Sequence, residues 1–201
     1  MKLTYLGDAH DHWKGSVFQY LQEGEILRNF LVDTMATDGS PWNAANSKLY
    51  AHLLRIEESQ LVQHDRTLSQ DRKARRRYFH NIPRTGDLFL DPDTGIKTSG
   101  SNNDNYLLPQ ELFELMATEK DRLVIVYQHS AHGSKMRERV KSVLAKLAEQ
   151  KRPFSCSSYE SNTVALLFFS MTAERTQSVR NCFARLTRGT DAADRIGQWN
   201  W

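Results

Sequence analysis

The sequence has few of the features that mark the specialised classes of protein. Only two cysteines occur, Cys156 and Cys182, and their separation matches neither a disulfide framework nor a zinc ribbon. No apolar run approaches the roughly 18 residues of a membrane span, and the first residues lack the charged-then-apolar profile of a secretory signal. We therefore expect a cytoplasmic protein with free thiols and no membrane partner.

The sequence also lacks a strong excess of charge of one sign. Its 27 Lys and Arg residues against 24 Asp and Glu residues leave a net charge of +3, so the total charge does not indicate a nucleic-acid partner. A chain of 201 residues is long enough for one well-formed core. We expect a single domain over residues 1–189, followed by a C-terminal tail over residues 190–201.

Positive charge is concentrated in one segment. Five basic residues fall within six positions, and Tyr78 and Phe79 follow at once. The five are Arg72, Lys73, Arg75, Arg76 and Arg77. Interleaved basic and aromatic side chains suit a nucleic-acid backbone with bases that stack nearby. The alternative is a solvated loop or helix face that binds no ligand.

Strand-like and helix-like segments alternate along most of the chain, and a hairpin follows. Apolar runs predict the strands and the 3.6-residue periodicity predicts the helices. The expected strands are 27–33, 88–90, 123–129, 154–159 and 164–171, and the main expected helices are 50–56, 109–116, 134–150 and 173–186. This order predicts a three-layer, Rossmann-like α/β fold, with a mostly parallel sheet and an antiparallel C-terminal hairpin.

The motif Asp91-Pro92-Asp93-Thr94-Gly95 follows a fully apolar strand. Parallel strands carry ligand sites where their carboxyl ends open into loops, so Asp91, Pro92 and Asp93 are candidate catalytic residues. The strand that ends at His129 is expected to deliver that side chain to the same edge of the sheet. The alternatives are an ordinary Asx-type turn at Asp91 and a strand-capping role for His129.

Two further polar segments precede this motif. The strand that ends at Asp33 turns through small residues to Gly39, which resembles a nucleoside-binding turn between a strand and a helix. Near the N-terminus, Asp8 and His10 lie in a polar cluster before a helix. Their spacing is that of metal ligands in metallophosphoesterases, whereas the alternative is a helix cap with exposed neighbours.

Three segments resemble the S-adenosylmethionine-dependent methyltransferases, and most closely the bacterial large-subunit ribosomal RNA adenine N6-methyltransferases. Residues 33–39, Asp-Thr-Met-Ala-Thr-Asp-Gly, resemble the cofactor turn of that family. Residues 11–14, Asp-His-Trp-Lys, resemble its N-terminal Asp-x-x-Lys, and residues 91–94 stand where it has Asp-Pro-Pro-Tyr. The chain also resembles a bacterial protein group that shares Asp-Pro-Asp-x-Gly and Tyr-Gln-His.

The resemblance implies roles for individual residues. Four residues of the turn would hold S-adenosylmethionine, and Lys14 would approach the carboxylate of this cofactor. The four are Asp33, Thr34, Asp38 and Gly39. Asp91 and the carbonyl of Pro92 would accept hydrogen bonds from an exocyclic amine, so that catalysis is mainly positioning. The chain departs from the family at Thr37, where a glycine is expected, and at Asp93 and Thr94, where Pro and a stacking aromatic are expected.

Three functions are compatible with these features. The first is a methyltransferase-like protein that acts on a nucleic acid or nucleotide with S-adenosylmethionine as the methyl donor. The second is a metal-dependent nuclease or phosphoesterase that uses Asp91, Asp93 and His129, with Asp8 and His10 as further ligands of a divalent metal. The third is a non-catalytic module on a degenerate methyltransferase fold, which binds nucleic acid or protein through residues 72–84 and the Trp-containing tail.

Overall fold

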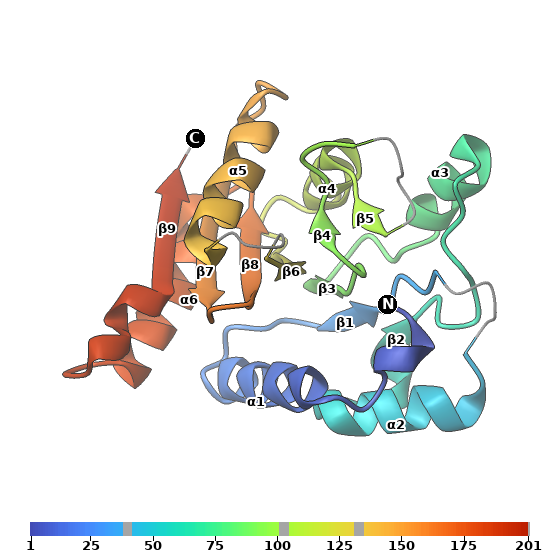
Figure 1. Cartoon of the computed structure of the whole chain (residues 1–201), viewed down its shortest axis with the longest axis horizontal. Coiled ribbons are helices and arrows are strands. Elements are labelled where there is room, and N and C mark those ends of the chain that lie inside the picture. Colours follow the sequence, from blue (N-terminus) through green and yellow to red (C-terminus); the bar gives the residue numbers. More distant parts are fainter. Residues whose placement is uncertain (38–41, 101–104, 131–134, 201) are drawn as a thin grey trace.

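The computed structural model describes residues 1–37, 42–100, 105–130 and 135–200. Its main sheet has seven strands in the order β2-β1-β3-β6-β8-β7-β9 (Figure 1). These strands are β1 (Leu31–Asp33), β2 (Leu61–Val62), β3 (Leu88–Leu90), β6 (Val124–His129), β7 (Ser155–Glu160), β8 (Val164–Ser170) and β9 (Ile196–Asn200). A small second sheet pairs β4 (Gly95–Ile96) with β5 (Tyr106–Leu107).

Strands β2, β1, β3 and β6 are parallel neighbours, and the pairs that follow in the sheet are antiparallel. Because β7 is antiparallel to β8, which is antiparallel to β6, β7 points the same way as the four parallel strands. The expected mostly parallel sheet and the antiparallel β7–β8 hairpin are therefore confirmed. Residues 196–200, expected within the C-terminal tail, form the edge strand β9 on β7.

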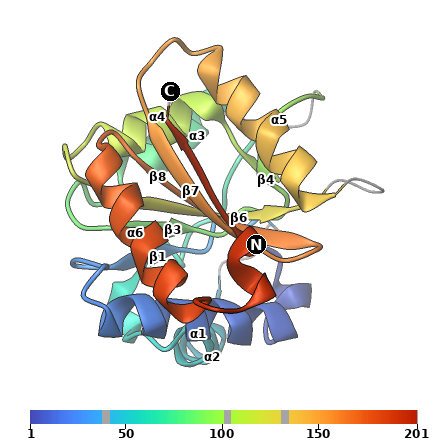
Figure 2. The ribbon, with the colours of Figure 1, turned by 90° about the vertical axis from the view of Figure 1, so that its left-hand side faces the viewer.

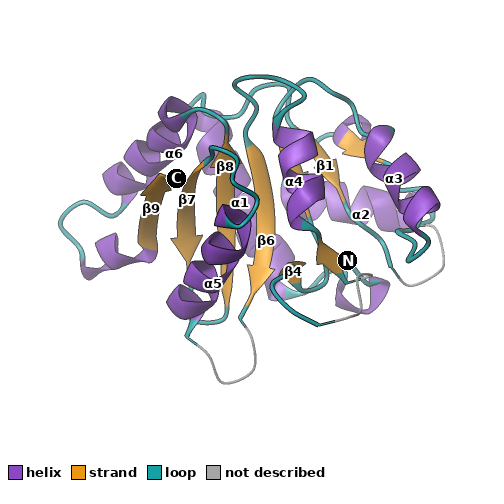
Figure 3. Cartoon of the chain, turned by 90° about the horizontal axis from the view of Figure 1, so that it is seen from above, coloured by secondary structure: helices purple, strands orange, loops and turns teal. Residues whose placement is uncertain are grey.

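The helices cover both faces of the sheet. They are α1 (Ala9–Glu23), α2 (Ala44–Leu54), α3 (Arg72–His80), α4 (Pro109–Met116), α5 (Met136–Ala148) and α6 (Ala173–Leu186). Helices α3, α4 and α5 lie on one face, in front of the sheet in Figure 3, and α1, α2 and α6 lie on the other. Figure 2 shows α5 and α6 on opposite sides of the antiparallel strands. No helix in the described ranges is long and apolar enough to cross a membrane.

Alternating side chains of each central strand supply two separate cores. Leu88 and Leu90 of β3 face the α3, α4 and α5 side, and Phe89 faces the α1, α2 and α6 side. Val126 and Tyr127 of β6 divide in the same way. Strands that are apolar at every position therefore lie between two layers of helices, as the sequence predicts for this fold class.

The strand order reverses at β1, and this reversal positions the candidate site. The chain passes from β1 to β2 on one side of it and then crosses to β3 on its other side. In α/β sheets, ligands bind at the carboxyl ends of the two strands that flank such a switch point. Here those strands are β1, which ends at Asp33, and β3, which is followed by Asp91.

Candidate functional site

The acidic residues that end β1 and β3 come together as predicted. Asp33 is in register with Leu90, and the backbone N–H of Asp91 donates to the carbonyl of Asp33 at 3.1 Å. Both side chains are buried. The parallel register thus brings the expected cofactor turn and the Asp91-Pro92-Asp93 motif to one edge of the sheet.

Lys14 of helix α1 binds the Asp91 carboxylate directly. Its ammonium lies 2.8 Å from Asp91 Oδ2 and 2.8 Å from Asp11 Oδ1, and the hydroxyl of Tyr50 donates to Asp91 Oδ2 at 2.5 Å. Asp11 and Lys14 are three positions apart on α1, so both face β3. Lys14 was expected to approach the carboxylate of a cofactor; in this structure two protein carboxylates surround its ammonium instead.

The environment of this cluster keeps both partners ionised. Burial alone would raise the pKa of Asp91, but the Lys14 ammonium, the amino terminus and the Tyr50 hydroxyl outweigh it and hold the pKa below its usual value. Burial would likewise lower the pKa of Lys14, but Asp91 and Asp11 raise it above the ordinary lysine value. Asp91 is therefore a carboxylate at neutral pH.

The Asp33 side chain is turned into the protein. Its Oδ1 accepts hydrogen bonds from the Met35 N–H at 2.8 Å and from the Tyr78 hydroxyl. Complete burial raises the pKa of Asp33 to about 6, against the opposing effect of these hydrogen bonds. The neighbouring Thr34 is also fully buried, and its hydroxyl has no hydrogen-bond partner among the described residues. Asp38 and Gly39, predicted to hold the cofactor, lie outside the described residues.

The amino group of Met1 contacts the segments that follow both β1 and β3, and Figure 1 marks the N-terminus beside the end of β1. It donates to the backbone carbonyls of Thr34 and Met35, each at 2.7 Å, and to that of Asp91 at 2.9 Å. It also lies 3.4 Å from Asp93 Oδ1. Three carbonyls and one carboxylate oxygen thus converge on the Met1 amino group, whose pKa is lowered by burial against the opposing effect of Asp93 and Asp91.

Thr37 and Asp93, two of the departures from the family pattern, contact each other. The Thr37 hydroxyl donates to Asp93 Oδ2, which ties the β1 turn to the loop after β3. The extra carboxylate therefore has a partner within the protein, and it also faces the Met1 ammonium. The Thr37 hydroxyl and the Met1 amino group therefore account for the position of the Asp93 carboxylate.

A cavity of about 280 Å³ opens beside this cluster. Its walls include Asp91, Pro92 and His129, as predicted, together with His10 and Tyr127. The Lys14 ammonium lies 4.4 Å from the centre of the Tyr127 ring, and the Tyr127 and His129 rings meet edge to face at 4.7 Å. Tyr127 is 3% exposed, and its hydroxyl has no partner in the part of the chain that the structure describes.

Gln128 points to the opposite face of β6 from Tyr127 and His129. Its side chain holds the backbone that follows the Asp91-Pro92-Asp93 motif. Its Oε1 accepts from the Ile96 N–H at 2.9 Å, and its Nε2 donates to the Thr94 carbonyl at 3.0 Å. The His129 N–H also donates to the Thr94 carbonyl, at 3.3 Å. Thr94 is therefore held by its backbone, and the rings that line the cavity come from other positions, among them His10, Tyr127 and His129.

Tyr50 and Tyr127 were not predicted as site residues. A signal existed for Tyr127, because residues two apart on a strand share a face and His129 was already a candidate. No comparable signal pointed to Tyr50, which reaches Asp91 from helix α2 across 41 positions of sequence.

The structure gives Asp8 and Asp91, two of the proposed metal ligands, other contacts. Asp8 caps α1, and its Oδ1 accepts from the N–H groups of His10 and Asp11 at 2.8 and 3.2 Å. Asp91 is paired with Lys14, whose positive charge opposes cation binding there. Within the described ranges, no three His, Cys, Asp or Glu side chains gather closely enough to hold a metal ion. Asp8 therefore has the helix-capping role that was the alternative to metal binding.

The basic segment forms helix α3, and its members divide into two groups. Arg75 is buried and makes a bidentate ion pair with Glu111 of α4, so it is removed from the predicted nucleic-acid surface. The other four are exposed on the helix. They are Arg72, Lys73, Arg76 and Arg77.

Comparison with known proteins adds little beyond this geometry. No protein-family model matches the chain, and no curated protein matches it. A solved structure of a Legionella pneumophila protein of the family DUF519 is similar over 98% of this chain and 96% of its own, with 10% sequence identity and a TM-score of 0.40.

Proposed function

We propose that this protein is a methyltransferase-like enzyme that binds S-adenosylmethionine at the β1–β3 switch point and methylates an amino group of a nucleic acid or nucleotide. The observation that carries the proposal is the position of the Met1 ammonium. S-adenosylmethionine is a methionine whose sulfur carries an adenosyl group, so its α-ammonium is the same chemical group that Met1 presents. We infer that the α-ammonium of the cofactor would take the place that the Met1 amino group holds.

The residues of the crevice fit this group. The carbonyls of Thr34, Met35 and Asp91 supply three acceptors for an α-ammonium, and the unpartnered Thr34 hydroxyl adds a buried polar atom beside them. When bound, S-adenosylmethionine would supply an electrophilic methyl group on its sulfur. The Met1 ammonium must leave these carbonyls before a second ammonium can use them.

Asp91 and Pro92 would position the amine to be methylated. Lys14 and Tyr50 both bind Oδ2 of Asp91, so Oδ1 keeps no hydrogen bond to a described residue. That oxygen and the Pro92 carbonyl can each accept a hydrogen bond from one N–H group of an exocyclic amine in the cavity. Because Lys14 keeps Asp91 ionised and weakly basic, Asp91 would orient the substrate amine rather than remove a proton from it.

His129 lines the cavity and would take up the proton released by the methylated amine. Burial lowers the pKa of its imidazole below the usual histidine value, against the effect of Asp91, so the ring is neutral at pH 7. The rings of His10 and His129 also offer faces for a substrate base, in place of the aromatic residue that the family carries at the position of Thr94.

Isothermal titration of the protein with S-adenosylmethionine tests the cofactor site. We expect saturable heat at millimolar cofactor, and at least tenfold weaker binding of 5′-methylthioadenosine, which lacks the amino-acid part. Equal affinity for the two compounds, or no heat with either, would contradict the proposal. Methyl transfer to short oligonucleotides should then fall by 10² or more in Asp91→Asn, but not in Glu138→Gln, which changes an exposed carboxylate on α5.

A further inference from the structure

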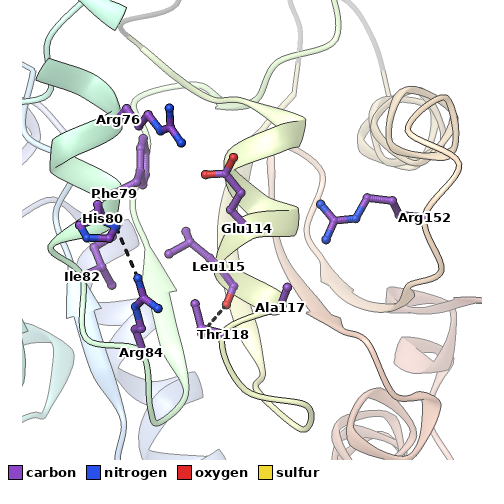
Figure 4. Close-up of a pocket in the computed structure, with 10 residues that line it drawn as sticks. All are labelled: Arg76, Phe79, His80, Ile82, Arg84, Glu114, Leu115, Ala117, Thr118 and Arg152. Carbon is purple, nitrogen blue, oxygen red and sulfur yellow. Dashed lines mark hydrogen bonds between the residues drawn. The ribbon is translucent and has the colours of Figure 1, made fainter. Parts of the chain in front are cut away.

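A second hollow, which shares no lining residue with the Asp91 cavity, lies between helices α3 and α4. Its volume is about 410 Å³, and α3 and α4 form its two sides (Figure 4). Phe79 and Leu115 make its floor. A neighbouring hollow of about 570 Å³ shares Arg76, Phe79 and Glu114 with it, so the two form one continuous groove along the helices.

The α3 side of this groove carries a row of basic groups. Arg72, Arg76 and His80 are four positions apart, so they share one face of the helix, and all three are exposed. Arg72 and Arg76 carry like charges at this spacing, which destabilises a helix. Arg76 makes no salt bridge among the described residues. The row extends over about 12 Å, at roughly 1.5 Å per residue.

Basic groups from other parts of the chain complete the groove. Arg84 follows α3, and Arg152 comes from the segment before β7. Beneath the floor, Arg122 is 1% exposed; its guanidinium binds the Thr118 hydroxyl and the Pro83 carbonyl, and no carboxylate is within salt-bridge distance in the described structure. Glu114 is the acid that lines this hollow, against these basic groups.

The Arg75–Glu111 pair fixes the width of the groove. The two guanidinium–carboxylate bonds join α3 to α4, and Arg75 also donates to the Tyr106 carbonyl at 2.6 Å. The two sides of the groove are therefore held apart at a set distance before any ligand arrives. A preformed site of this kind loses little entropy when it binds.

From these features, we infer that the α3–α4 groove binds the sugar–phosphate backbone of a single-stranded nucleic acid. A small anion needs donors that converge on one point, whereas these charges are spread along a line and come from three segments. The basic groups of α3, together with Arg84 and Arg152, suit a single strand whose phosphates meet arginine above an apolar floor, while Glu114 lies on the opposite, α4 side. The inference is independent of methyl transfer and of the cofactor.

Fluorescence anisotropy with a labelled single strand of about 12 nucleotides tests the groove, without any cofactor. We expect the double variant Arg76→Glu, Arg84→Glu to bind at least tenfold more weakly. The slope of log affinity against log salt should become shallower by about 0.7 for each phosphate that is no longer neutralised. Arg152→Glu alone should also weaken binding, because Arg152 reaches the groove from outside α3.

The matched control is Arg180→Glu, Arg188→Glu, which makes the same charge change at exposed positions on and just after α6. This control should bind within twofold of the unchanged protein. An equal loss in the control, unchanged affinity in Arg152→Glu, or tighter binding of duplex than of single strand would each overturn the inference. Competition by polyglutamate as effective as that by oligonucleotide would also overturn it and indicate an acidic protein partner instead.

Discussion

The Lys14 ammonium lies 2.8 Å from Asp91 Oδ2, and each of these side chains is 3% exposed. This buried ion pair joins helix α1 to the carboxyl end of β3. Because Asp11 and Tyr50 complete the cluster, the position of the Asp91 carboxylate is set by groups from two helices. The pair fixes the orientation of the residue that is proposed to hold the substrate amine.

Removal of the lysine should therefore be costly. Lys14→Met removes the cation that lies between the buried Asp91 and Asp11 carboxylates, and we expect the free energy of unfolding to fall by about 3–5 kcal/mol in urea denaturation at pH 7. Lys141→Met, which removes an exposed partner of Glu138, should cost less than about 1 kcal/mol. A similar small cost for both variants would show that the buried pair does not hold the site.

Asp33 should make stability depend on pH in a direction unusual for a carboxyl group. Its pKa is about 6 in the folded protein, against an ordinary value of 3.8, so between these limits the folded state binds more protons than the unfolded state. Stability contributed by this group therefore decreases as pH rises from about 4 to 6. At pH 7.5 the ionised Asp33 therefore lowers the free energy of unfolding by about 3 kcal/mol, which follows from the difference between a pKa of about 6 and one of 3.8.

Asp33→Asn keeps an acceptor for Tyr78 and Met35 but cannot ionise. We expect the variant to be more stable than the unchanged protein at pH 7.5, and the difference to vanish near pH 4, in urea unfolding at both pH values. Asp65→Asn, at an exposed position after β2, should show no such trend. A difference that does not change with pH would contradict the predicted shift of the Asp33 pKa.

Gly95 should not tolerate a side chain. Its φ is +111°, and a Cβ there would lie 2.3 Å from the amide atoms of Gln128, which hold Thr94 and Ile96. We expect Gly95→Ala to lower the melting temperature clearly more than Gly100→Ala, whose φ is +85° with no atom within 4 Å of the added Cβ. Equal effects would mean that backbone strain alone, and not the contact with Gln128, requires glycine.

The charge state of His129 can be followed by NMR titration of its imidazole. Burial lowers its pKa, and the Asp91 carboxylate raises it, so we expect a midpoint below 6.5. In Asp91→Asn, the favourable charge is absent, and the midpoint should move lower still. The protein should also lose stability from this group as pH falls below 6.5, because the unfolded state then binds more protons. A midpoint that rises in Asp91→Asn would contradict this arrangement.

The fold and the meeting of Asp33 with Asp91 could be predicted because both depend on local pattern. Strands that are apolar at every position must lie between helices, and acids that end two parallel strands must share an edge. The burial of Arg75 also had a local signal, since Tyr78 and Phe79 lie three and four positions later on the same face of α3.

The partners of Lys14 and the Met1 ammonium had no such signal. Lys14 and Asp91 are 77 positions apart, and the pattern of each segment allows many partners. The contacts of the Met1 amino group depend on the backbone carbonyls of a turn, which carry no sequence information. Long-range polar contacts of this kind are decided by packing of the whole domain.

Met1 is proposed to occupy the place of the methionine part of S-adenosylmethionine, and the whole cofactor site depends on this relationship. NMR of the protein labelled with ¹³C at its five methionine methyl groups tests it most directly. The Met1 signal is assigned by replacing each of the other four with Leu. Titration with S-adenosylhomocysteine should move the Met1 methyl from its buried position to that of an exposed methionine, in step with saturation. Binding that leaves the Met1 signal unchanged would contradict the proposal.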